Sequence, residues 1–116
     1  MIAPTYRLIV VAASLAGAAG VALSAAAAHG ERALTGTASS FLLVHAAALL
    51  AIGLTGRGRT LALAGAVLFI GVALFTASLA VLDFTGSRLF PLSAPIGGGL
   101  LIVGWLLVGA SVIFHR

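Results

Sequence analysis

The stretch Gly17-Ala-Ala-Gly-Val-Ala-Leu-Ser-Ala-Ala-Ala-Ala-His-Gly30 decides the fold. Nearly every residue in it is small, and it completes an apolar run that begins at Leu8. A helix with so little side chain is stable in lipid only when neighbouring helices lie close against it, because packing replaces the hydrophobic drive that water would supply. We therefore predict that this segment is the packing centre of a small bundle of membrane helices.

The composition of the chain indicates a membrane protein. Hydrophobic residues make up 62% of the 116 residues and charged residues 7%, whereas a soluble domain has about 25% charged residues. A soluble domain of this length also leaves much of its surface in water. The net charge of +4 comes from scattered arginines. Nucleic-acid binding needs basic residues clustered on one face, so we expect no nucleic-acid partner.

Four apolar runs predict an all-α membrane protein of four antiparallel transmembrane helices, in a single domain over residues 1–116. A spanning helix needs about 20 apolar residues. The predicted helices cover about residues 6–28, 39–55, 61–82 and 95–114. The first run could instead be a signal peptide, but it is longer than the typical signal core of about 7–15 residues.

The segments between these runs predict the caps and the orientation. We expect residues 29–38 to form a polar link, with Thr37, Ser39 or Ser40 capping the second helix, Thr60 the third and Ser93 the fourth. The excess of arginine lies with the termini and the central turn, so the positive-inside rule predicts that both termini are cytoplasmic. The side predicted to be cytoplasmic holds Arg7, Arg57, Arg59 and Arg116. The other side holds Arg32 and Arg88 with Glu31 and Asp83, and Arg88 is available to pair with Asp83.

Small residues recur at helical spacing within three of the runs. In lipid such residues let helix backbones approach closely, and a glycine inside a helix is costly without that benefit. We predict helix packing at Gly17, Gly20, Ser24, Gly71, Ser78, Gly97 and Gly104.

His45 is the main candidate for a functional side chain, because an ionisable residue inside a membrane is a functional candidate by default. It could bind a quinone or haem, with His29 as a second binding residue and His29 or Asp83 as its hydrogen-bond partner. The alternative is structural, since a histidine in a bundle can bond a carbonyl or hydroxyl of its surroundings. Trp105 is predicted to serve packing. We predict no metal site and no catalytic residues, because the histidines and acids lack the spacing of a motif.

Ordered segments along the chain resemble one family. Gly20-Val-Ala-Leu-Ser-Ala-Ala-Ala-Ala-His-Gly30 resembles the signature "GVALGAFGAHG" of the bacterial YgdD-like family, also called domain of unknown function 423, with transmembrane protein 256 as its animal relative. Three further segments are similar to its "HALALL", "LFSGSL" and "TPIGG…GWLLL" stretches: residues 45–50, residues 74–79, and residues 95–100 with 104–107. The resemblance implies a four-helix protein of the bacterial inner membrane, and it implies no reaction.

Three hypotheses of function follow. The first is a protein without enzymatic activity or cofactor, acting in the lipid bilayer as a homo-oligomer or as an accessory or structural subunit of a larger membrane complex, because small-residue stripes occur on several helices. The second is a lipid-, quinone- or haem-binding module centred on His45. The third is a small transporter or channel, for which the chain offers little of the expected polar pathway.

Overall fold

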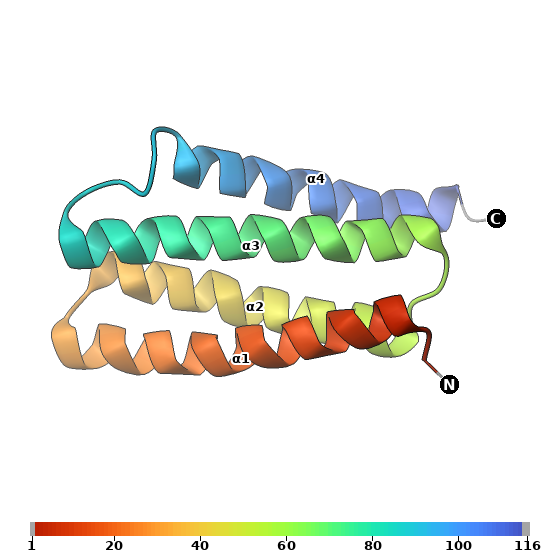
Figure 1. Cartoon of the computed structure of the whole chain (residues 1–116), viewed down its shortest axis with the longest axis horizontal. Helices are drawn as coiled ribbons and strands as arrows, with labels where there is room; N and C mark the ends of the chain where they lie inside the picture. Colours follow the sequence, from red (N-terminus) through yellow and green to blue (C-terminus); the bar gives the residue numbers. More distant parts are fainter. Residues whose placement is uncertain (1, 115–116) are drawn as a thin grey trace.

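The computed structural model describes residues 2–114 and contains four α-helices (Figure 1). They are α1 (Pro4–Gly30), α2 (Ala33–Thr55), α3 (Arg59–Thr85) and α4 (Ser93–Ile113). All four are long and apolar enough to cross a membrane, which confirms the all-helical class and the number of candidate spans. The longest dimension of the molecule is 46 Å, close to the full thickness of a bilayer with its headgroups. The predicted position of Arg116 lies outside the described residues.

The boundary of α2 differs from the sequence prediction. The helix begins at Ala33 rather than Ser39, so the predicted polar link over residues 29–38 is wrong for most of its length. The reason is a tertiary contact: the backbone N–H of Thr35 in the first turn donates to the carboxylate of Asp83 on α3. The hydroxyls predicted to cap α2 instead donate to carbonyls one turn earlier in the same helix; they belong to Thr37, Ser39 and Ser40.

The side-chain caps predicted for α3 and α4, Thr60 and Ser93, are also not formed. A residue with positive φ precedes each helix instead. No side chain caps α3 or α4 in the described structure. Gly58 precedes α3 with φ 86° and ψ 167°, a region that is essentially reserved for glycine, and the Tyr6 hydroxyl donates to its carbonyl at 2.7 Å. Leu92 precedes α4, so Ser93 is the first helical residue rather than the cap. The turn between α2 and α3 is therefore shaped by Gly58 and tied to α1.

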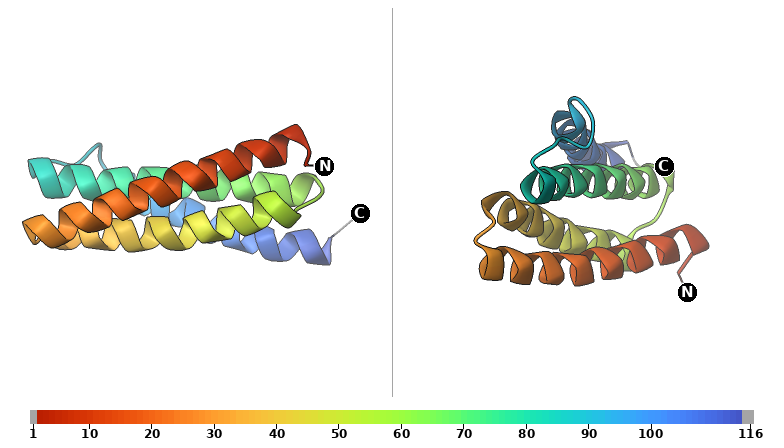
Figure 2. Two further views of the ribbon diagram at one scale, coloured as in Figure 1. Left: turned by 90° about the horizontal axis from the view of Figure 1, so that it is seen from below. Right: turned by 60° about the vertical axis from the view of Figure 1, so that its left-hand side comes forward.

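The four helices form an open zigzag (Figures 1 and 2). Helix α1 packs along α2 and α3 packs along α4, and the two pairs are joined by the α2–α3 contact and a smaller contact between α1 and α3. Within the described residues, α4 brings no Cα atom within 8 Å of α1 or α2. The α1–α2 and α3–α4 links lie at one end of the stack, and the α2–α3 turn lies at the other (Figure 1). Helix α2 therefore has the most enclosed surface, while α1 and α4 are the outer helices.

Glycines lie where the helices of each pair are closest. In the first pair, Gly20 is covered by the side chain of Leu43 on α2. In the second pair, a Cβ at Gly71 would lie 3.0 Å from the backbone nitrogen of Leu101, and one at Gly104 would lie 2.7 Å from the Leu68 side chain. Gly17, Gly20, Gly71, Ser78, Gly97 and Gly104 all lie on packed surfaces. Ser24 differs, because it lies on the exposed side of α1.

The substitution Gly97→Ala tests the closest of these contacts. The added methyl group would lie 2.6 Å from the backbone nitrogen of Phe75 and 2.9 Å from its Cα. Backbone cannot move aside as a flexible side chain can, so we expect a loss of about 1–3 kcal/mol in the free energy of unfolding. The measurement is thermal or denaturant unfolding of the purified protein in detergent.

Gly98→Ala is the matched control for Gly97→Ala. The nearest atoms to its added methyl group are 3.9 Å away on the Phe75 ring, which is an ordinary van der Waals contact. We expect this variant to unfold like the wild type or slightly later, because alanine favours helix over glycine. Equal stability of the two variants would contradict the close α3–α4 contact.

Candidate functional site at the histidine–tryptophan bridge

His45 lies on the buried face of α2, where it is 5% exposed. Its Nδ1 atom is 2.6 Å from the carbonyl oxygen of Phe41, one turn earlier in the same helix. Its Nε2 atom accepts a hydrogen bond of 3.0 Å from the indole nitrogen of Trp105 on α4. This bridge joins two helices whose backbones do not approach each other in the described structure.

The partners of His45 define its tautomer. An indole N–H can only donate, so Nε2 must be the unprotonated nitrogen. Nδ1 then carries the proton and donates it to the Phe41 carbonyl, and the imidazole is neutral. Both ring nitrogens are satisfied, as a buried polar group requires. Trp105 was predicted to serve packing, and its ring does pack against His45, but the prediction did not include the hydrogen bond that it donates.

Aromatic rings extend the bridge to α3. The ring centroids of Phe41 and Phe75 are 4.7 Å apart, and those of His45 and Trp105 are 5.7 Å apart at an interplanar angle of 61°. Such tilted and edge-on pairs are favoured geometries that add to area burial. Three helices are thus linked by side chains at one level of the stack.

An apolar groove of about 510 Å³ runs along this aromatic cluster. Its lining residues come from α2, α3 and α4, and they include Trp105, which is 44% exposed. The groove is lined by Phe41, His45, Phe75, Leu101, Ile102 and Trp105, among others. Since it opens sideways between helices that are apolar enough to span a membrane, the chemistry it offers is contact with an apolar chain or ring.

Neither predicted partner of His45 contacts it. His29 is exposed at the end of α1. The carboxylate of Asp83 accepts hydrogen bonds from the backbone N–H and the hydroxyl of Thr35, at 2.8 and 2.7 Å. The structure therefore separates His29, His45 and Asp83, which the sequence analysis grouped as one candidate site.

Asp83 organises a second polar cluster, at the end of the stack that holds the α1–α2 link. Its carboxylate completes the first turn of α2, where helix N–H groups lack partners and a negative charge is stabilised. The Arg32 guanidinium donates to the Asp83 backbone carbonyl at 2.8 Å, and its central carbon lies 4.0 Å from the centre of the Phe84 ring. The pairing predicted between Arg88 and Asp83 is replaced by these contacts.

Sequence reasoning missed two contributors to these clusters, Trp105 and Thr35, and one buried polar residue outside them, Thr76. Trp105 carries a donor near the middle of an apolar helix, and that donor was the available signal. Thr35 has no local signal, because its partner lies far along the chain. Thr76 has a buried hydroxyl oxygen without a hydrogen-bond partner in the described part of the chain, beside an apolar groove of about 320 Å³ between α1 and α3.

The fold and the bridge define a small membrane protein whose central histidine is held by its neighbours. The chain belongs to the family described as "Protein of unknown function (DUF423)", whose model matches residues 8–98, and this confirms the sequence resemblance. It is 37% identical over 73 residues to a UPF0382 membrane protein of Staphylococcus saprophyticus, covering 61% of each chain. It is also 37% identical over 73 residues to one of Staphylococcus epidermidis, covering 61% of this chain and 60% of the relative.

The chain thus spans less than two thirds of the length of the curated relatives that it matches. Their printed names describe them as membrane proteins and give no activity. No solved structure matches the chain.

The substitution His45→Ala tests the bridge. It removes the acceptor for Trp105 and the contacts of a buried ring, so we expect a lower melting temperature in detergent. A hydrogen bond between membrane helices contributes about 0.6 kcal/mol on average and at most about 1.7, and the lost packing adds to this. Val44→Ala, at a residue 61% exposed on the same helix, is the control and should unfold like the wild type. Unchanged stability of His45→Ala would rule out the structural role.

The substitution Asp83→Asn tests the contact between α3 and α2. An amide keeps the size of the side chain but loses the charge that strengthens the two hydrogen bonds from Thr35. We expect a melting temperature lower by a few degrees and faster hydrogen exchange at the start of α2. Glu31→Gln removes the other acid of the chain, which is exposed, and should leave both quantities unchanged. If the two variants behave alike, Asp83 does not cap α2.

Proposed function

We propose that the protein is a non-enzymatic accessory or structural subunit of the bacterial inner membrane, acting as a homo-oligomer or within a larger membrane complex. Its four helices would cross the bilayer in alternating directions, with both termini in the cytoplasm. The arginines at the end that holds the α2–α3 turn support this orientation, because positively charged residues favour the cytoplasmic side.

Two exposed glycines on the outer surface of α4, Gly99 and Gly109, carry the proposal. A glycine inside a helix costs about 1 kcal/mol relative to alanine, and Gly97 and Gly104 offset that cost by contacts with α3. Gly99 and Gly109 have no such compensation, because a Cβ added at either position would have no atom of another helix within 4 Å in the described structure. A partner helix packed on this side of α4 would use them, as small residues do between helices in membranes.

The use of the polar side chains supports a role without catalysis. His45 and Trp105 bond each other, and Asp83 bonds Thr35. A general base or a proton carrier needs a site that can exchange its proton with a substrate or a neighbour. In both clusters the polar atoms are instead engaged in joining helices.

Binding of an apolar ligand is the second candidate, favoured by the groove beside Trp105. A lipid chain or the ring of a quinone fits an apolar, aromatic wall of this kind. Haem is less suited to the site, because the Nε2 atom of His45 already accepts from Trp105 and ligation would require that bond to break. Organic extraction and an absorbance spectrum of the purified protein test for either ligand.

Assembly is tested by adding bulk to the outer surface of α4. We expect native mass spectrometry and cross-linking in mild detergent to show a complex of the wild type with itself or with a partner, and Gly99→Leu and Gly109→Leu to reduce it severalfold. Ala47→Leu places the same side chain at an exposed position of α2 and should leave the complex intact. A wild type that is monomeric and retains no partner would refute the proposal.

A further inference from the structure

We propose that the hollow at the α2–α3 turn binds the phosphate-bearing headgroup of an anionic membrane lipid. The hollow has a volume of about 340 Å³. Arg57 and Arg59 of the turn contribute its charge, and residues of α3 and α4 contribute the rest of its wall: Thr60, Leu61, Ser111 and Phe114. This inference concerns a different surface from the outer face of α4 and does not depend on the protein's assembly.

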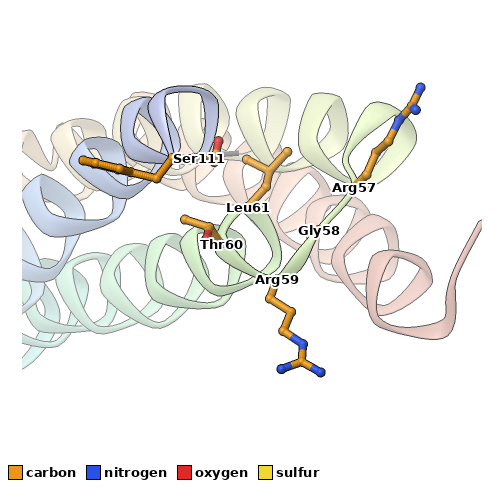
Figure 3. A pocket seen from close by; sticks show the side chains of 7 residues that line it. Arg57, Gly58, Arg59, Thr60, Leu61 and Ser111 are labelled. Atoms are coloured by element: carbon orange, nitrogen blue, oxygen red, sulfur yellow. The ribbon is translucent and has the colours of Figure 1, made fainter. Parts of the chain in front are cut away.

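The turn is built to hold two arginines in fixed backbone positions. Gly58 lies between them in a conformation that other residues avoid, and its carbonyl accepts the hydrogen bond from the buried Tyr6. Figure 3 shows the two guanidinium groups extending from the turn in different directions. Both groups extend away from Leu61 and Ser111 in Figure 3, so they reach a phosphate in the hollow by rotation of their long side chains.

The distribution of charge over the molecule favours an anion at this end. The chain has two acidic residues, Glu31 and Asp83, and both lie at the opposite end of the stack, at the ends of α1 and α3. Arg7, at the start of α1, adds a third positive charge near the turn. Each basic residue close to an anionic membrane surface contributes about fivefold to binding at low salt.

The lining of the hollow also includes two apolar side chains, Leu61 and Phe114, which distinguish a lipid from free phosphate as the ligand. Figure 3 shows Leu61 and Thr60 at the start of α3 facing Ser111 of α4. Phe114, 73% exposed, lies at the end of α4. The first N–H groups of α3 have no side-chain cap and add partial positive charge beside the arginines. Charge at the rim and apolar side chains below match a phosphate attached to a glyceride.

The test compares lipid binding by the full chain and its variants in detergent, where membrane orientation plays no part. Native mass spectrometry would follow titrations with phosphatidylglycerol and with phosphatidylcholine. We expect the wild type to prefer the anionic lipid and the preference to weaken as salt rises. In the double variant Arg57→Gln/Arg59→Gln the affinity for phosphatidylglycerol should fall severalfold, because both charged donors of the turn are lost.

Two further variants separate a defined site from general charge. Arg88→Gln removes an exposed arginine at the other end of the stack and should keep the wild-type affinity. Ser111→Leu fills the hollow without changing the charge and should weaken binding of phosphatidylglycerol. Circular dichroism confirms that each variant is folded.

Several results would overturn the proposal. They are equal affinity of the wild type for the two lipids, retention of affinity in the double variant, an equal loss in Arg88→Gln, or unchanged binding in Ser111→Leu. Full competition by millimolar inorganic phosphate would also overturn it, because the site would then recognise the free anion rather than a lipid.

Discussion

Close approach of helix backbones is the constraint on which this structure depends. Apolar side chains gain little by leaving lipid for protein, so helices in a membrane associate through packing and a few hydrogen bonds. Each helix pair meets this requirement with glycine, as at Gly20 between α1 and α2 and at Gly97 between α3 and α4. The contacts within the two pairs are the most extensive, and the pairs meet through α2–α3 and, to a lesser extent, α1–α3, where Gly65 faces Ile9.

Side-chain hydrogen bonds add links between elements that backbone packing alone does not provide. Helices α2 and α4 are too far apart for close backbone contact in the described structure, and His45 and Trp105 bridge the distance by a hydrogen bond. At one end of the stack Asp83 ties α3 to the first turn of α2. At the other end Tyr6 ties α1 to the α2–α3 turn. His45, Asp83 and Tyr6 thus use their hydrogen bonds to join separate elements.

The helical class, the number of candidate spans and the family could be predicted from the sequence. Long apolar runs, and the polar and glycine-containing segments between them, are local signals. The sequence was insufficient for the start of α2, since Thr35 reads as a polar link residue until its bond to Asp83 is known. The same limit applies to the candidate site. His45 was visible as an unusual polar residue, and the indole N–H of Trp105 signalled a need for an acceptor, but nothing local pairs two residues so distant in sequence.

The bond between Thr35 and Asp83 has a consequence for biogenesis. A membrane chain is made from its amino terminus, so α2 leaves the ribosome before the end of α3 exists. The first turn of α2 then lacks the carboxylate that satisfies its N–H group. Its amino-terminal turn is thus completed only after α3 has been synthesised, and the hairpin of α1 and α2 matures late although it is translated first.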